Sequence, residues 1–207
     1  MSPRFISPSS VPHVSSDSDL APADAPVHIE PVNGQESGVE GEMLRAVMRR
    51  VASPVTIVTA AAGGVLRGAT IGSFTSVSLD PPLVSFNVQK GSSLHDVLLA
   101  ADAFAIHLLG ENQADLATHF AIPDVGSSEQ FRTVEHAHPE PDVPPILPDV
   151  FGVLHCTCWA VHDAGDHTLF LGRVERVTEG EARSASSGQA GPLLYYDRSY
   201  RAVGDEV

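Results

Sequence analysis

Two runs of strand-forming residues meet at a pair of glycines, and this pattern restricts the fold more than any other feature of the sequence. Residues 54–72 read PVTIVTAAAGGVLRGATIG, with Gly63 and Gly64 between the two runs. Such a pair is typical of a β-hairpin, because the turn needs positive φ angles that glycine adopts without steric cost. The sequence therefore predicts antiparallel strands in this region.

Further strand candidates follow at short intervals. Residues 83–88 and 102–110 are apolar runs of strand length, and residues 151–180 predict two strands around the turn Asp163–Asp166. Residues 191–204 predict one more short strand and a polar turn. Because hairpins join most of these strands, the pattern favours a mainly β fold, an antiparallel barrel with short inserted α-helices, over a parallel α/β sheet.

Three segments have helical spacing. Residues 41–52 place apolar side chains on one side and three arginines on a solvated face, and residues 111–121 pair Leu116 with Phe120 at i, i+4. Residues 92–101 predict a helix with a capping box that begins at Ser93, since Asp96 follows three residues later. Residues 122–149 contain six prolines and predict a loop-rich connection.

Composition separates the N-terminal segment from the rest of the chain. Residues 1–42 are rich in serine, proline and acids, which predicts a disordered acidic leader before a domain at 43–207. The net charge of −14 opposes binding to nucleic acid. No apolar run reaches the roughly 18 residues of a membrane span, and the N-terminus lacks a signal-peptide pattern, so a cytoplasmic protein without membrane contact is expected.

Cysteines and histidines do not form a recognisable metal site. Cys156 and Cys158 lie two apart on a predicted strand, and we expect buried, reduced thiols there. A metal bound with His155 or His162 is the less favoured alternative, because no second cluster supplies the missing ligands. For the other histidines we expect a core position at His107, exposed helix faces at His95 and His119, and loop positions without metal at His136 and His138.

The segment from Gly68 to Phe86, GATIGSFTSVSLDPPLVSF, carries six hydroxyl side chains and one charge. Hydroxyls and backbone N–H groups in such a segment can hold a phosphate without basic residues. Gly68 and Gly72 would let a ligand approach the backbone closely. A serine- and threonine-rich strand with one wet face explains the same residues equally well. Dinucleotide-binding, phosphate-loop and nucleophile-elbow motifs are absent from the sequence.

The order and spacing of several segments resemble the flavin reductase-like family of FMN-binding split barrels. The segments are RVASPVTIVTA, GVLRGATIGSFTSVSLDPPLVSFNV, LATHFA, GDHTLFLGRV and PLLYYDRSYRAVG, and the resemblance extends from about Glu42 to Gly204. It implies a split β-barrel, a homodimer, and an NAD(P)H:flavin oxidoreductase that reduces FAD or FMN with NADH or NADPH. Reduced flavin would then diffuse to a partner monooxygenase.

The resemblance also implies site residues. His167 would lie beside the flavin ring as the catalytic residue, and Tyr200 and Arg201 would line the same cleft. Contacts to the ribityl-phosphate end are implied for Ala69, Thr70, Ile71, Gly72 and Ser73. The ring would lie along Ser76, Val77 and Ser78, and the phosphate side would be closed by Asn87, Lys90, Ser92 and Ser93.

Two positions depart from the family pattern. Gly72 stands where the family often has asparagine, and His155 stands where it often has an acidic residue. These departures favour a second hypothesis, a flavin- or haem-binding split barrel that does not act as a reductase. A barrel that has lost the flavin is a third hypothesis, and the nearly complete hydroxyl motif argues against it.

Overall fold

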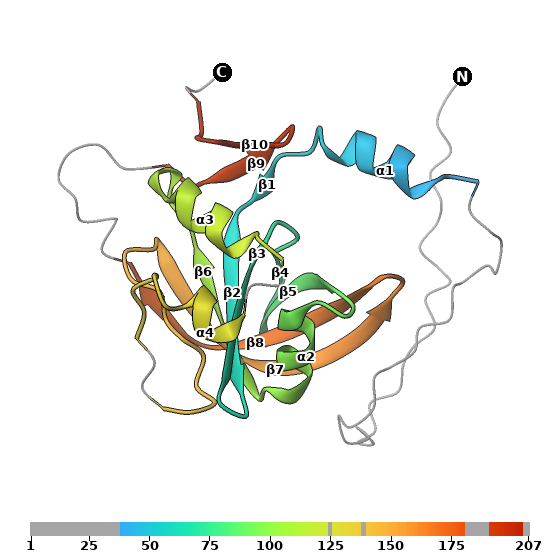
Figure 1. Ribbon diagram of the computed structural model, residues 1–207. Coiled ribbons are helices and arrows are strands. Elements are labelled where there is room, and N and C mark those ends of the chain that lie inside the picture. Colours follow the sequence, from blue (N-terminus) through green and yellow to red (C-terminus); the bar gives the residue numbers. More distant parts are fainter. Residues whose placement is uncertain (1–37, 124–125, 138–139, 181–190, 205–207) are drawn as a thin grey trace, which may run out of the picture.

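One antiparallel sheet of seven strands forms most of the computed structural model, which describes residues 38–123, 126–137, 140–180 and 191–204. Its strands follow the order β3-β2-β6-β7-β8-β5-β4 (Figure 1). Their bounds are β2 Thr56–Ala62, β3 Val65–Ile71, β4 Thr75–Leu79, β5 Pro82–Gln89, β6 Ala103–Leu108, β7 Gly152–Ala164 and β8 His167–Glu179.

The two edge strands of this sheet are consecutive in the chain. Only residues 72–74 separate β3 from β4, and consecutive Cα atoms are about 3.8 Å apart, so Ile71 and Thr75 are within about 15 Å of each other. The sheet must therefore curl until its edges approach. The hydroxyl of Ser73 accepts a hydrogen bond from the N–H of Asn87 on β5 at 2.9 Å, which ties the connection to the barrel wall. The predicted split β-barrel is confirmed.

Turn residues explain two of the hairpins. Gly63 and Gly64 have φ angles of 57° and 75°, which confirms the predicted β2–β3 turn. The C-terminal residues form two strands where one was predicted, β9 (Leu194–Tyr196) and β10 (Ser199–Arg201). In a small second sheet, β9 pairs with β10 on one side and with β1 (Ser53–Pro54) on the other. Their turn uses Asp197 and Arg198 at φ 46° and 63°, and it carries no glycine that would mark it in the sequence.

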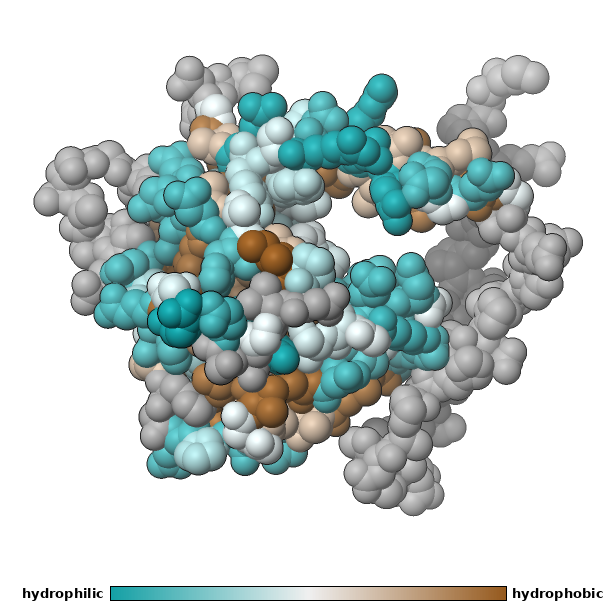
Figure 2. Space-filling model, in the orientation of Figure 1, coloured by the Kyte–Doolittle hydropathy of each residue, from teal (hydrophilic) through white to brown (hydrophobic). Residues whose placement is uncertain are grey.

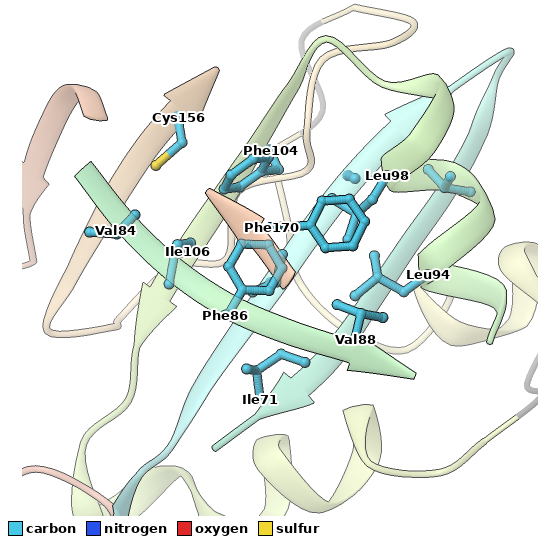
Figure 3. Close-up of a cluster of buried hydrophobic side chains, with 13 residues drawn as sticks. Ile71, Val84, Phe86, Val88, Leu94, Leu98, Phe104, Ile106, Cys156 and Phe170 are labelled. Atoms are coloured by element: carbon cyan, nitrogen blue, oxygen red, sulfur yellow. The ribbon is translucent and has the colours of Figure 1, made fainter. Parts of the chain in front are cut away.

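Two apolar clusters lie on the two faces of β2, because side chains alternate along a strand. The cluster inside the barrel contains Phe86, which stacks on Phe170 at 5.6 Å and meets the edge of Phe104 at 5.2 Å (Figure 3). Helix α2 (Ser93–Ala100) packs Leu94 and Leu98 against it. The second cluster includes Ile57 and Phe120.

Short helices cover the second cluster. They are the 3₁₀ turn η1 (Glu111–Gln113), α3 (Ala114–Phe120) and α4 (Ser127–Gln130), which falls within the segment predicted as loop. Phe120 is buried and Leu116 packs beside it, as their spacing predicts. None of the helices among the described residues is long and apolar enough to span a bilayer.

Several sequence predictions need correction. Ser92, not Ser93, caps α2, with its side chain accepting from the N–H of His95 at 3.4 Å. His95 is largely buried and contacts Thr168 through Nε2 at 2.9 Å, and His119 is partly buried. Cys158 is exposed, whereas Cys156 is buried as expected. The interior position predicted for His107 is confirmed.

Helix α1 (Gly41–Met48) contributes no buried residue to the molecule. It lies to one side of the barrel (Figure 1), where the Arg49 carbonyl after its last turn accepts a hydrogen bond from the N–H of Asp197 at 3.0 Å. Hydrophobic surface is visible on this helix in Figure 2. Its exposed apolar side chains are Met43, Leu44 and Val47, together with Met48 and Val51 at and beyond its end. Residues 1–37 of the predicted leader lie outside the described residues.

Candidate functional site

A cavity of about 430 Å³ opens where the barrel is split, between the end of β3, the β5–α2 turn and the α3–α4 segment. The sheet leaves β3 unpaired on this side, so backbone and side chains from three regions meet there. The lining residues are Gly68, Ala69, Thr70, Ile71, Gly72, Ser73, Asn87, Val88, Gln89, Ser92, Ser93, Leu94, Phe120, Ala121, Ile122, Pro123, Gln130 and His167.

Most of the residues implied by the family resemblance come together here. The cavity is lined by Ala69, Thr70, Ile71, Gly72, Ser73, Asn87, Ser92, Ser93 and His167. The other implied residues do not line it: Ser76, Val77, Ser78, Lys90, Tyr200 and Arg201. The first three lie on the edge strand β4, where the register shifts between Ser76 and Ser78. Tyr200 instead packs against Tyr195 at 5.5 Å and against the second apolar cluster.

The hydroxyls of this segment bind the protein's own backbone. Thr70 Oγ1 donates to the carbonyl of Ala117 on α3 at 2.6 Å, so its only proton is already engaged. Ser73 bridges to Asn87, and Ser78 accepts from the N–H of Asp80 at 3.2 Å. The serine and threonine hydroxyls therefore stabilise the segment that connects β3 to β4, in addition to any role in ligand binding.

Free donors come instead from β5 and α2. Within the described residues, the side chains of Asn87 and Ser93 make no hydrogen bond that would engage their donors. The first N–H groups of a helix have no partner inside the helix, and those of Ser93 and Leu94 lie at the cavity wall. Neutral donors at a helix N-terminus suit an anion without any basic residue.

Lys90 stabilises a hairpin rather than lining the cavity. Its Nζ contacts both carboxylate oxygens of Asp163 at 2.9 Å and donates to the carbonyl of Gly165 at 2.6 Å. Its backbone N–H donates to the carbonyl of Asp166 at 3.0 Å. These bonds fix the tip of the β7–β8 hairpin against the β5–α2 turn.

His167 begins β8 immediately after that tip. Its Nδ1 lies 2.8 Å from Asp166 Oδ1, so Nδ1–H donates to the carboxylate and Nε2 points away from this bond. The hydrogen bond from His167 holds the pKa of Asp166 below its usual range. His167 is half-exposed and lies at the cavity wall, accessible to a ligand.

Sequence reasoning missed the wall formed by Phe120, Ala121, Ile122, Pro123 and Gln130. Phe120 is expected only on the apolar side of a short helix, and Gln130 lies in a segment expected to be loop. No local signal marks either residue as part of a site, because their contact with β3 joins segments about 50 to 60 positions apart in the chain. Leu94 was also missed, although it adjoins the implied residue Ser93.

No group of three or more metal-ligating side chains occurs in the part of the chain that the structure describes. His136 Nδ1 contacts the carbonyl of Val134 at 2.8 Å, and His138 lies outside the described residues.

Comparisons with known proteins agree with the fold and the site. The profile of the flavin reductase like domain matches residues 48–204. An NADH:FMN oxidoreductase of Rhodococcus qingshengii is 39% identical over 163 residues, which cover 75% of this chain and 78% of the relative. The reductase component of a 4-hydroxyphenylacetate 3-monooxygenase from Thermus thermophilus is 34% identical over 162 residues, 78% of this chain and 96% of the relative.

A solved structure is similar as well. The NADH:FAD oxidoreductase of Streptomyces globisporus, in complex with NAD and FAD fragments, superposes with a TM-score of 0.68 at 34% identity, covering 79% of this chain and 92% of that one. The profile match spans the barrel, the residues around the cavity and His167. The chain belongs to the flavin reductase like domain family.

Proposed function

We propose that the protein is an NADH-dependent flavin reductase that takes FMN or FAD as a substrate and releases it reduced. The observation that carries this proposal is the cavity at the barrel split, where neutral donors of β5 and α2 lie near His167. The relatives named as NADH:FMN and NADH-dependent FAD reductases support it, and they favour it over a split barrel without reductase activity.

The donor set fits a flavin's polar tail. Asn87, Ser93 and the first amides of α2 offer several N–H and O–H groups to a phosphate. None of the lining residues is a lysine, arginine, aspartate or glutamate. Hydrogen bonds from neutral donors are weaker than charge-assisted ones, so the site binds the flavin with modest affinity. Modest affinity suits a ligand that must enter oxidised and leave reduced.

The chain's own residues orient the reactants. When bound, the flavin accepts a hydride from NADH and can carry it to another enzyme. The hydrogen bond from His167 to Asp166 fixes the imidazole, and Lys90 fixes the hairpin that carries both residues. Holding two reactants in a reactive geometry supplies much of the rate enhancement in such a transfer. His167 serves this purpose by limiting where the nicotinamide lies.

Reduced flavin reaches its user by diffusion in this proposal. The partner is a monooxygenase that consumes reduced flavin. The relative from Thermus thermophilus, named as the reductase component of a monooxygenase, supports this partner. Ser76, Val77 and Ser78 stay proposed ring contacts on β4. The disordered leader at 1–42 and a cytoplasmic location stay predictions from the sequence.

Replacing His167 by alanine is expected to lower kcat/KM for NADH roughly tenfold while leaving flavin affinity nearly unchanged. Loss of nicotinamide absorbance with FMN or FAD in air measures the first quantity, and quenching of flavin fluorescence measures the second. His155→Ala is a matched control, because His155 lies on the same hairpin about 30 Å along the strands from His167.

The outcomes of this assay are distinct. Wild-type protein that binds flavin but does not oxidise NADH would support a carrier instead of a reductase. Wild-type protein that binds no flavin would refute the proposal. Equal kcat/KM in wild type and His167→Ala would remove the role given to the histidine.

We also propose a homodimer. Helix α1 has eight residues and no buried side chain, and an isolated helix of that length is marginal in water. The edge strand β4 leaves Val77 51% and Leu79 89% exposed, and Trp159 on β7 is 45% exposed. Exposed apolar surface of this extent is typical of an interface, and a second copy would cover it.

Sedimentation equilibrium is expected to give twice the chain mass for the wild type. Val47→Glu with Leu79→Glu should shift the mass toward one chain, because each change buries a charge at the proposed interface. Glu111→Gln, which alters an exposed side chain of η1, serves as the control. A monomeric wild type would contradict the proposal.

A further inference from the structure

The side chain of Gln130 takes the place of a neighbouring strand at one residue of β3. Its Nε2 donates to the carbonyl of Gly68 at 2.8 Å, and its Oε1 accepts from the N–H of Gly68 at 3.0 Å. β3 is an edge strand, so these backbone groups face away from β2 and would otherwise lack a partner. Gln130 is only 4% exposed.

Surrounding contacts hold this amide in place. The carbonyl of Gln130 accepts from His119 Nε2 at 2.7 Å, and its N–H donates to the carbonyl of Gly126 at 2.9 Å. The ring of Phe120 covers Gly68 so closely that an added Cβ would lie 2.7 Å from its Cε1. Both ends of the α3–α4 segment are therefore fixed to β3 at the same residue.

The amide also marks one end of the cavity. Gly68 and Gln130 line it together with the next residues of β3. Backbone groups alternate in direction along a strand, so those of Thr70 face the same open edge as those of Gly68. Gln130 closes this edge at Gly68, and the stretch from Thr70 onward remains available to a ligand.

We propose that Gln130 is a positioning residue for the flavin, which sets the separation between β3 and the α3–α4 wall of the cavity. The inference rests on the proposed flavin reductase function. Without the two hydrogen bonds of the Gln130 amide, the α3–α4 wall separates from β3. Water then competes with the flavin for the backbone groups at the open edge of β3. The side chain acts through Gly68, not by taking part in the reaction.

The experiment compares two substitutions at this position by flavin fluorescence quenching. Gln130→Met removes both bonds at similar volume, and we expect the Kd for FMN to rise about tenfold. Gln130→Glu keeps the acceptor but, when ionised, cannot donate to the carbonyl of Gly68. Its Kd is expected to be high at neutral pH and to approach the wild-type value as mild acid protonates the carboxyl group.

A purely structural glutamine would not give this pattern. Gln113→Met is the matched control, because the Gln113 amide also binds two backbone groups, the N–H of Gly110 at 2.9 Å and the carbonyl of Asp149 at 3.1 Å, outside the cavity. Its loss should lower the melting temperature without changing the Kd. The Kd of the wild type is measured over the same pH range, because other titratable groups lie near Gln130 and are present in both proteins. These groups are His119, Glu129, Arg132, His136 and His167.

Each result decides between the alternatives. Folded Gln130→Met or Gln130→Glu protein that binds FMN as tightly as wild type, with a flat pH profile, overturns the inference while the reductase function stands. A wild type that binds no flavin overturns both. If Gln130→Met does not fold, the recovery or continued weakness of Gln130→Glu in mild acid decides the question.

Discussion

Gly68→Ala is expected to destabilise the protein by about 2 kcal/mol and to weaken flavin binding more than any change at Gln130. The added Cβ would lie 2.7 Å from Phe120 Cε1 and 2.8 Å from Cδ1, distances that real Cβ atoms do not show. The ring cannot simply rotate away, because Phe131 lies against it at 5.4 Å. Phe120 must shift, and the wall of the cavity shifts with it.

Gly72→Ala provides the matched comparison, since Gly72 lies on the same segment and lines the same cavity. A Cβ there would meet Ser53 Cβ at 3.7 Å and the carbonyl of Pro54 at 3.8 Å, which are ordinary contacts. The fold does not require glycine at this position. We expect Gly72→Ala to keep the stability of the wild type and to weaken flavin binding only, because a ligand approaches this backbone closely.

Urea unfolding and flavin titration of both variants show whether each glycine is needed for packing or for ligand binding. Gly68 serves packing and Gly72 serves the ligand, so only Gly68→Ala should shift the unfolding midpoint. Equal stability of the two variants would show that Phe120 adapts without cost. Flavin binding to Gly72→Ala at wild-type affinity would remove the ligand from the vicinity of Gly72.

How much of the fold the sequence predicts depends on how far apart in the chain the interacting residues lie. The β2–β3 hairpin could be predicted, because Gly63 and Gly64 encode its turn locally. The β9–β10 hairpin was predicted only as one strand and a polar turn, because its turn at Asp197 and Arg198 has positive φ angles but no glycine. Barrel closure became predictable only through the family resemblance, since strand order depends on pairing between distant segments.

The candidate site residues also depend on contacts between segments that are distant in the chain. Hydroxyls between Gly68 and Phe86 fit a ligand site and a strand with one wet face equally well. The structure shows that Thr70 donates to Ala117, 47 positions away, a bond that the sequence does not reveal. Lys90 was implied as a phosphate contact, and the structure pairs it with Asp163, 73 positions away. Residue type indicated which groups can bind an anion. Tertiary structure determines which of them are already engaged.

His107 makes the protein sensitive to acid. The imidazole is fully buried on β6, with Nδ1–H donating to the carbonyl of Ile57 at 3.0 Å and Nε2 accepting from the N–H of Leu147 at 3.1 Å. Protonation would turn Nε2 from an acceptor into a donor, which would then face the N–H of Leu147. Burial, with a smaller contribution from nearby His155, lowers the pKa of His107 from 6.5 to about 4.

The free energy of unfolding is therefore expected to fall as the pH drops from 6.5 to about 4. Above this range neither state protonates His107, and within it only the unfolded chain binds the proton, which favours unfolding. A depression of this size corresponds to about 3 kcal/mol in total. Below the native pKa both states are protonated and the His107 contribution to the slope disappears.

His107→Gln tests the assignment, because glutamine keeps one donor and one acceptor but does not titrate. We expect the variant to be less stable than wild type by about 1–3 kcal/mol at neutral pH, and this difference to shrink in acid as only the wild type loses stability. The other nine histidines are common to both proteins, so subtracting the two urea-unfolding profiles isolates His107. Parallel profiles would show that its burial does not control the acid response, whereas converging profiles would assign that response to a single imidazole between β2 and the loop that carries Leu147.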